Sequence, residues 1–291
     1  MDARQLEYFL AVVDHGGVNK AAQALYLAQP SLSQAIRALE RDLGNDLFHR
    51  VGRRVVLTQA GHALIEPARQ VVRGLASARA SVEAAAGLET GRVEIAAMPS
   101  QAVEPLSAMI RAFTTRHPGL AVTIRAAPTA SVVIDMVRTG VTEVGLLAST
   151  EPLKAVGVDL DRIGTQRFVL VAPADWRVPD GGVVRHQDLA GQRVIVGQLG
   201  TGMRRLVEEI RADVGLTEVV ESEHREAILP LVLGGVGVAV LADSWASLAR
   251  QSGALVLDIE PPAYLHLALA SRQAPITPAA QAFLDVAREI R

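Results

Sequence analysis

The polar side chains between residues 29 and 37 have the types and spacing needed to read the edges of DNA bases. In this stretch Leu32, Ile36 and Leu39 recur at helical spacing and form one apolar stripe. With that stripe buried, four hydrogen-bonding side chains lie on or beside the outward face: Ser31, Ser33, Gln34 and Arg37. Side chains of this length reach base edges in a major groove. The stretch therefore predicts a recognition helix.

A shorter helix before it would complete a helix-turn-helix. Ala21, Ala22 and Leu25 form its buried stripe, and Asn19 is expected to cap it, because a side-chain oxygen can accept from a free N–H of the first turn. Gln29-Pro30 is expected to open the recognition helix, since proline at the first helical position lacks only a donor that would be unpaired there. We count Asn19, Gln29 and Pro30 with the DNA-contacting residues. A plain helical hairpin with a solvated polar face is the alternative.

Three arginines follow the helix-turn-helix at Arg50, Arg53 and Arg54. They surround a turn at Gly52 between two short β-prone runs. Arginines in such a position can contact phosphate or enter the minor groove. The pattern predicts the wing of a winged helix, with DNA contact, so that residues 1–58 form a DNA-binding domain. A solvated turn is the alternative for the arginines alone.

Two further helices are predicted around this domain. Residues 2–14 carry an apolar face, and Asp2 with Gln5 resembles a capping box. Residues 59–86 are alanine-rich with small apolar residues at three/four spacing, Thr58 is a plausible N-cap, and Pro67 can kink the helix. A helix with no core of its own suits packing against a second copy. Residues 59–90 are therefore predicted to be a linker and dimer seam, with a break at residues 87–91.

Composition excludes several classes of protein. The 291 residues contain no cysteine, which excludes disulfides and thiolate sites. The spacing of the histidines does not predict a metal site, and no motif predicts a cofactor. The N-terminus lacks an apolar signal core and no apolar run suits a membrane span, so we expect a soluble, cytoplasmic protein. Net charge is −2, and residues 1–58 hold seven Lys/Arg against six Asp/Glu. DNA binding must therefore rest on a local patch.

Residues 92–291 alternate strand and helix, which predicts parallel sheets with crossover helices. The expected strands are 93–97, 120–126, 144–148, 168–172, 194–196, 219–220, 238–241 and 265–270. The expected helices are one that begins at 99, runs through 113 and stops at 117–119, and others at 131–138, from 203, at 227–233 and at 277–290.

The chain resembles the LysR-type transcriptional regulators, most densely in its first 61 residues. The resemblance is carried by Ala21-Ala22-x-x-Leu25, Gln29-Pro30-Ser31-Leu32-Ser33, Ile36-x-x-Leu39-Glu40, Leu43-Gly44-x-x-Leu47-Phe48-x-Arg50 and Leu57-Thr58-x-x-Gly61. Position 28, commonly a serine in that family, is Ala28. Loss of such a cap costs about 1 kcal/mol, so the helix start is expected to be frayed or otherwise compensated.

The resemblance implies a winged helix-turn-helix, a long linker helix and two Rossmann-like α/β subdomains of the periplasmic-binding-protein type. Subdomain I would take residues 92–163 and 266–291, and subdomain II residues 164–265. It also implies a homodimer or a tetramer built from dimers, with double-stranded DNA and a small-molecule effector as partners and RNA polymerase as a candidate partner.

An effector is expected beyond the carboxyl ends of the strands. Three loops there precede helices, at 98–101, 127–131 and 197–203, and free N–H groups at helix starts favour an anion such as an organic acid. The predicted effector residues are Ser100, Gln101, Thr129, Ser131, Gly200, Thr201 and Gly202.

The sequence therefore predicts a ligand-responsive transcriptional regulator and no enzyme. Two alternatives stay open: a DNA-binding protein whose second part serves only oligomerisation, and a solute receptor or enzyme built on the same α/β fold. Residues 1–58, which a receptor does not need, disfavour the latter.

Overall fold

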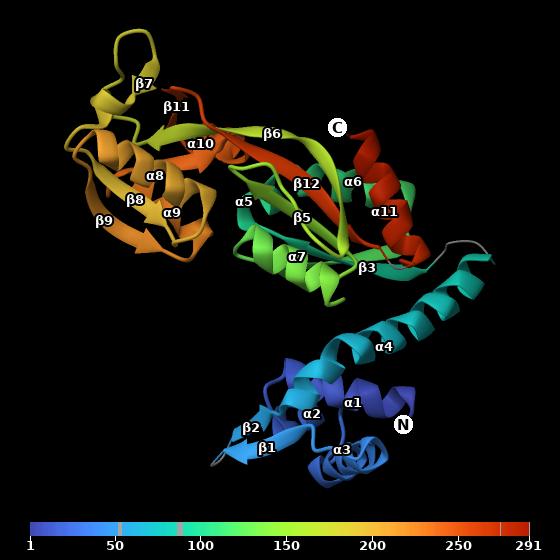
Figure 1. Cartoon of the computed structure of the whole chain (residues 1–291). Coiled ribbons are helices and arrows are strands. Elements are labelled where there is room, and N and C mark those ends of the chain that lie inside the picture. Colours follow the sequence, from blue (N-terminus) through green and yellow to red (C-terminus); the bar gives the residue numbers. More distant parts are fainter. Residues whose placement is uncertain (52–53, 86–89, 274, 291) are drawn as a thin grey trace. The chain divides into compact units, whose positions relative to one another are not determined.

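Four helices and a β-hairpin form the first of the two compact units of the chain (Figure 1). The computed structural model describes residues 1–51, 54–85, 90–273 and 275–290. The elements of the first unit are α1 (Ala3–Asp14), α2 (Val18–Ala24), α3 (Gln29–Leu43), β1 (Phe48–Val51), β2 (Arg54–Leu57) and α4 (Gln59–Ala85).

The helix-turn-helix is confirmed, and its apolar stripes form the core of the unit. Leu32 and Leu39 of α3 are fully buried, and Ile36 is nearly so. The predicted capping box of α1 is also present, because the Asp2 carboxylate accepts from the N–H of Gln5 at 2.8 Å and the Gln5 side chain accepts from the N–H of Asp2 at 2.9 Å.

Two expected helix starts in this unit are corrected. Asn19 does not cap α2, because Gly17 occupies the N-cap position and the helix begins at Val18. The Gly16-Gly17 pair, both at positive φ, turns the chain so that the N-cap lies two residues before the expected position. Pro30 is the second residue of α3 rather than the first, a position whose N–H also has no partner within the helix.

The second unit contains β3 to α11, and its strands form one sheet. Its helices are α5 (Pro99–Val103), α6 (Leu106–Arg116), α7 (Ala130–Arg138), α8 (Gly202–Asp213), α9 (Arg225–Leu233), α10 (Ala246–Gln251) and α11 (Pro278–Glu289), with short helices η1 (His186–Leu189) and η2 (Asp243–Trp245). Its strands are β3 (Gly91–Ala97), β4 (Leu120–Ala126), β5 (Val144–Ser149), β6 (Val158–Ala172), β7 (Val183–Arg185), β8 (Arg193–Gly197), β9 (Thr217–Ser222), β10 (Val238–Ala242), β11 (Leu255–Glu260) and β12 (Tyr264–Arg272).

The long strand β6 joins two halves of this sheet (Figure 1). In the first half the order is β4-β3-β5-β12-β6, and in the second it is β6-β10-β8-β9. Residues 158–167 of β6 pair with β12, whereas residues 168–172 pair with β10 and β11. The inner pairs β3/β4, β3/β5, β8/β9 and β8/β10 are parallel, as predicted.

The sheet is mixed rather than parallel throughout. β12 runs antiparallel to both β5 and β6, and β6 runs antiparallel to β10. The helix expected from 99 to a stop at 117–119 is two helices, α5 and α6, because Pro105 lies between them and has no N–H to continue the helical ladder.

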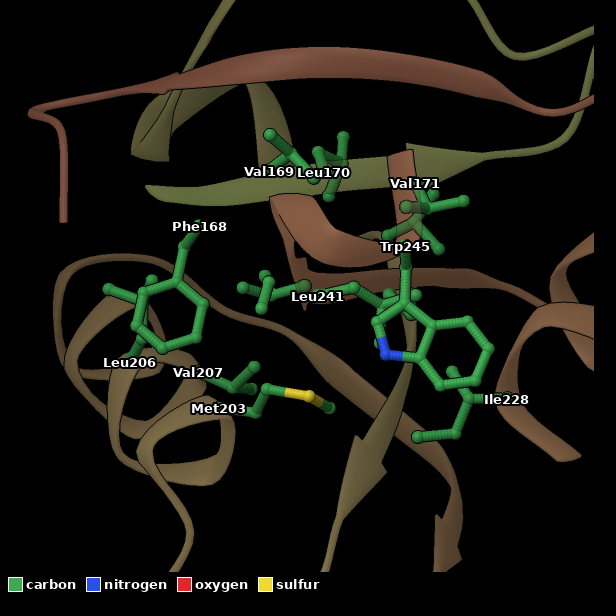
Figure 2. Close-up of a cluster of buried hydrophobic side chains, with 14 of the residues drawn as sticks. Phe168, Val169, Leu170, Val171, Met203, Leu206, Val207, Ile228, Leu241 and Trp245 are labelled. Carbon is green, nitrogen blue, oxygen red and sulfur yellow. The ribbon is translucent and has the colours of Figure 1, made fainter. Parts of the chain in front are cut away.

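The core of the second half packs helix α8 against strands β6 and β10. Figure 2 shows Phe168 of β6, Met203, Leu206 and Val207 of α8, Leu241 of β10 and the indole of Trp245 in this cluster. All are buried. In the part of the chain that the structure describes, no helix is both long and apolar enough to cross a membrane.

Candidate nucleic-acid interface and ligand cleft

The outward face of α3 carries the side chains predicted to read bases. Ser31, Gln34 and Arg37 are exposed and Ser33 is half-buried, while the opposite face is the buried stripe. The exposed Gln29 amide donates to the Ser33 hydroxyl at 2.7 Å, so these two predicted DNA-contacting side chains are hydrogen-bonded to each other. Ala28 holds the extended N-cap conformation at φ −69° and ψ 132°, but no side chain caps α3.

Glu40 fixes the wing relative to the recognition helix. Its carboxylate accepts from the N–H groups of Leu47 at 2.9 Å and Phe48 at 3.2 Å, so one side chain of α3 clamps the start of β1. The predicted hairpin is present, with Arg50 paired to Val55 in register. Arg50 and Arg54 belong to β1 and β2, and Arg53 lies outside the described residues.

The Thr58-x-x-Gly61 motif joins the wing to α4. The Thr58 hydroxyl donates to the carbonyl oxygen of Asp46 at 2.7 Å and accepts from the N–H of Gly61 at 3.0 Å, which confirms the predicted cap. A Cβ at Gly61 would overlap the carbonyl oxygen of Leu47, so only glycine allows this approach.

Beyond its first turns, α4 presents apolar side chains to solvent. Val71 and Leu75 are 47% and 46% exposed, and Val82 is 74% exposed. Their spacing puts them on one side of the helix. None of the three belongs to the hydrophobic cluster of the first unit or packs against it.

A cavity of about 420 Å³ lies between the two halves of the sheet in the second unit. All three loops expected at the effector site contribute to it, through Met98, Ala130 and the segment 199–202. Of the predicted effector residues, Gly200, Thr201 and Gly202 line the cavity, together with Ser149, Thr150 and Arg205. We call this cavity the cleft.

The other predicted effector residues lie beside or beneath the cleft. Ser100 and Gln101 are buried and point into contacts that tie the halves of the unit together: the Trp245 indole donates to the Ser100 hydroxyl at 3.3 Å, and the Gln101 amide donates to Gln166 at 2.8 Å. Thr129 and Ser131 hydrogen-bond each other at 2.9 Å on either side of the lining residue Ala130.

An exposed ion pair spans one edge of the cleft. Arg205 of α8 lies 2.7 Å from the Glu151 carboxylate and 3.4 Å from the Thr150 hydroxyl, both in the loop after β5. Gly202 makes a close approach at the same edge, since a Cβ there would lie 2.8 Å from the Leu265 side chain and 3.2 Å from that of Thr150. The start of α8 therefore packs closely against the first half of the sheet.

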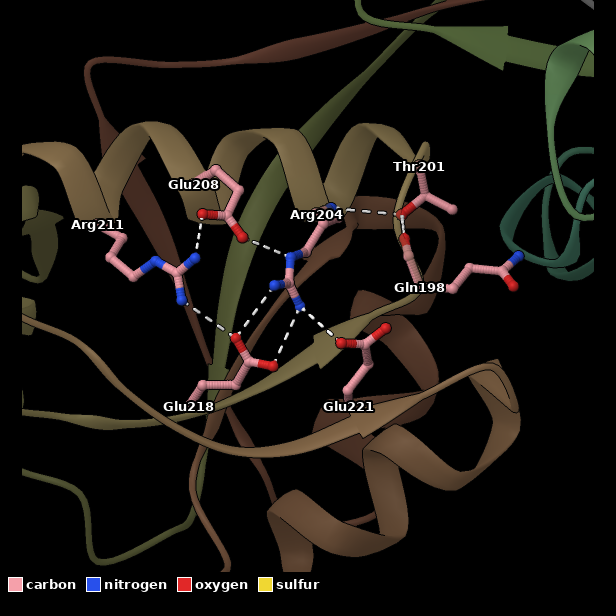
Figure 3. A network of polar contacts seen from close by, with 7 residues as sticks. All are labelled: Gln198, Thr201, Arg204, Glu208, Arg211, Glu218 and Glu221. Atoms are coloured by element: carbon pink, nitrogen blue, oxygen red, sulfur yellow. Dashed lines mark hydrogen bonds and ion pairs between the residues drawn. The ribbon is translucent and has the colours of Figure 1, made fainter.

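A charged network anchors α8 to β9, and two of its members, Arg204 and Glu208, line the cleft (Figure 3). Arg204 is 8% exposed and meets Glu208 at 2.5 Å, Glu218 at 3.1 Å and Glu221 at 3.3 Å. Arg211 adds contacts to Glu208 and Glu218.

Protonation in this network is governed by the ion pairs. Burial opposes the charge on Arg204, but hydrogen bonds to Glu208 and Glu218 prevail and raise its pKa. Burial likewise opposes the charge on Glu208, and hydrogen bonds from Arg204 and Arg211 prevail and lower its pKa. The buried charge on Arg204 is therefore paired with the carboxylates around it.

Arg225, the first residue of α9, is as buried as Arg204 but differs in its partners. It is 8% exposed, and it takes part in none of the ion pairs of the described residues. Its Nη1 donates to the sulfur of Met203. Burial lowers the pKa of its guanidinium. Arg225 is not among the predicted site residues, although it follows the carboxyl end of β9 by three residues, a region where ligand-binding residues occur.

Comparison with known proteins agrees with this two-part architecture. The family model "Bacterial regulatory helix-turn-helix protein, lysR family" matches residues 3–62, and "LysR substrate binding domain" matches residues 86–290. The regulator TfdS of Cupriavidus pinatubonensis is 30% identical over 302 residues, covering 99% of this chain and 98% of the relative. The regulator CbbR of Rhodospirillum rubrum is 27% identical over 292 residues, covering 98% and 96%.

Solved structures show the same fold over the full chain. CbnR in complex with its target DNA has a TM-score of 0.71 at 23% identity and covers 100% of both chains. A full-length OxyR variant from Pseudomonas aeruginosa has a TM-score of 0.76 at 22% identity and covers 100% of this chain and 95% of its own.

Proposed function

Because the chain belongs to the LysR family of DNA-binding transcriptional regulators, we propose that the outward face of α3 reads an operator and that the cleft binds an effector controlling this reading. The family consists of regulators with an effector-binding domain and not of enzymes. The observation that carries the proposal is the exposure of Gln34 and Arg37 beside a wing clamped by Glu40.

In this proposal, α3, the wing and α4 of the first unit each make a different kind of contact. Ser31, Gln34 and Arg37 contact base edges, since amide and guanidinium groups pair with two acceptors or donors on one base. Arg50, Arg53 and Arg54 contact the sugar-phosphate backbone. A second copy covers Val71, Leu75 and Val82 of α4, and two such dimers form a tetramer on DNA in the cytoplasm, where RNA polymerase is a further partner.

The second unit responds to a small anionic effector. Its halves act as the subdomains 92–163 with 266–291 and 164–265, and the effector lies in the cleft between them. An effector that binds one arrangement of the halves more tightly shifts the population toward it, and thereby the spacing of the DNA-binding units in the oligomer.

Binding to a site selected from a random DNA pool tests the assignment of α3. Gln34→Ala and Arg37→Ala are each expected to weaken binding to the selected site by about 1–3 kcal/mol and to leave binding to random DNA nearly unchanged. Gln70→Ala, on the exposed surface of α4, is the control and should bind as the wild type does. Equal losses on both DNAs would assign the side chains to phosphate instead.

Thermal-shift screening separates an effector-responsive regulator from one whose second unit serves only assembly. A ligand that binds only the folded state must raise the melting temperature. If neither anionic nor neutral compounds of cleft size shift it, the assembly-only alternative is favoured.

A further inference from the structure

Arg41 lies on the outward face of α3, in line with a side chain predicted to read bases. Seven residues are nearly two helical turns, so Arg41 follows Gln34 along the same line, opposite the buried stripe. Arg37 lies between them, four residues before Arg41, and is its neighbour on the helix surface. Arg41 is not among the DNA-contacting residues predicted from the sequence.

Arg37 and Arg41 are both exposed and line the same surface hollow. The hollow has a volume of about 820 Å³ and is lined by this face of α3 and by the loop of residues 44–46 that follows it. Gly44 ends α3 in the left-handed conformation at φ 66°, which turns the chain out of the helix and into this loop. The base-reading face of α3 is therefore continuous with a concave surface that contains a second arginine.

The protein itself does not engage either of these guanidinium groups. Among the described residues, the side chains of Arg37 and Arg41 form no ion pair and no hydrogen bond. By contrast, Arg69 of α4 in the same unit pairs with Asp14. A guanidinium without an internal partner can bind phosphate without first giving up an ion pair.

Two acids near Arg41 have partners elsewhere. The Glu40 carboxylate accepts from two N–H groups at the start of β1. Asp42 projects from another side of the helix and pairs with the N-terminal ammonium at 2.7 Å. Asp46 also lines the hollow, and its carboxylate has no hydrogen bond or ion pair among the described residues. The hollow therefore presents two unpaired guanidinium groups and one unpaired carboxylate.

We propose that Arg41 contacts a phosphate of the DNA backbone while Gln34 and Arg37 reach base edges. This rests on the proposed function, because it places α3 in the major groove. Seven residues advance an α-helix by about 10 Å, and the major groove is about 12 Å wide. A helix with Gln34 at a base therefore brings Arg41 to a strand that borders the groove. A phosphate contact of this kind fixes the register of the helix on DNA without reading its sequence.

Salt-dependent binding of the full-length protein tests this contact. Anisotropy titrations give the Kd for a selected operator site and for random DNA, and the slope of log Kd against log salt reports the number of phosphate contacts. Arg41→Gln removes the charge and keeps a hydrogen-bonding side chain, whereas Arg41→Lys keeps the charge. Arg111→Gln, at an exposed position of α6 in the second unit, is the matched control.

Arg41→Gln is expected to raise the Kd for operator and random DNA by the same factor and to lower the slope by about 0.9 for each copy of Arg41 on the DNA. Arg41→Lys and Arg111→Gln should keep the slope of the wild type. The melting temperature of Arg41→Gln should equal that of the wild type, because no ion pair is lost. A wild-type slope in Arg41→Gln would overturn the proposal. A loss confined to the operator would also overturn it, since Arg41 would then read a base.

Asp46→Asn tests the same hollow with a charge change of the opposite sign. Its carboxylate repels a phosphate strand held by Arg41, so its removal should lower the Kd for both DNAs, most strongly at low salt where charges are least screened. Asp175→Asn, exposed in the second unit, is the control and should bind as the wild type does. Unchanged or weaker binding by Asp46→Asn would mean that no phosphate strand lies along the hollow.

Failure of this inference can be told apart from failure of the proposed function. If Gln34→Ala and Arg37→Ala weaken operator binding but Arg41→Gln binds as the wild type does, base reading by α3 stands and the phosphate contact of Arg41 is wrong. If Arg41→Gln flattens the slope but Gln34→Ala and Arg37→Ala bind the operator normally, the phosphate contact stands and base reading by this face of α3 is wrong.

Discussion

The recognition helix α3 begins without a side-chain cap, and a single substitution can supply one. Ala28 already has the extended conformation of an N-cap residue, so a serine there can accept from a first-turn N–H without moving the backbone. Ala28→Ser is expected to stabilise the first unit by about 1 kcal/mol. Calorimetry should show the transition of this unit at a higher temperature.

Ala28→Val provides the comparison for this cap. Valine is larger than serine but offers no acceptor, and its transition should not rise. If the serine and valine variants have the same melting temperature, the missing side-chain cap does not lower the stability of the unit, and other contacts stabilise the start of α3.

At the residue scale, the sequence predicted the contacts that depend on near neighbours and missed those that depend on distant ones. The Asp2 box and the Thr58 cap involve partners three residues away and were predicted. Asn19 was assigned wrongly, because two glycines before it set the helix start. The bond between Trp245 and Ser100, 145 residues apart, has no local signature, and neither does the burial of Arg225.

At the scale of the element, α4 is predicted to be held by a second copy of itself. Leu75→Asp should convert a dimeric fragment of residues 1–88, which has its own core, to a monomer, because it places a charge in an apolar seam. Gln70→Asp adds the same charge on another side of the helix and should leave the dimer intact. Light scattering measures both, and a monomeric wild-type fragment would refute the seam.

The charged network between α8 and β9 should make the stability of the protein depend on pH. The folded-state pKa of Glu208 is lowered, so its contribution is present above the unfolded pKa, about 4.3, and is lost as pH falls through the lower folded value. Glu208→Gln should therefore melt below the wild type at pH 7, and the difference should shrink below pH 4. Glu209→Gln, exposed on the same helix, is the control. A difference that is constant with pH would exclude this cause.

Elements with strong periodicity or β-branched runs were predicted with nearly correct bounds, among them β4 and β10. The short β7, β11 and α10 were missed, because three to six residues give no clear period. The antiparallel course of β12 was missed for another reason. Strand direction depends on pairing with residues more than a hundred positions earlier, which alternation of elements does not reveal.

For the molecule as a whole, a net charge of −2 means that DNA binding relies on a few local cations. Each phosphate contact contributes about one unit to the slope of log affinity against log salt. Arg53→Ala combined with Arg54→Ala is expected to weaken binding to all sequences and to flatten this slope by about two units. Anisotropy titrations over a range of salt concentrations would measure it, and a slope equal to that of the wild type would mean that the wing arginines are solvated.

The position of β12 also has a consequence for synthesis on the ribosome. This strand is nearly the last element made, yet it lies between β5 and β6 in the first half of the sheet. Until residue 272 has left the exit tunnel, β5 has an open edge, and open edges pair readily with other chains. The strands β8, β9 and β10 emerge earlier and can associate first. A premature stop before residue 264 should therefore yield a chain whose second half is formed but whose first half aggregates.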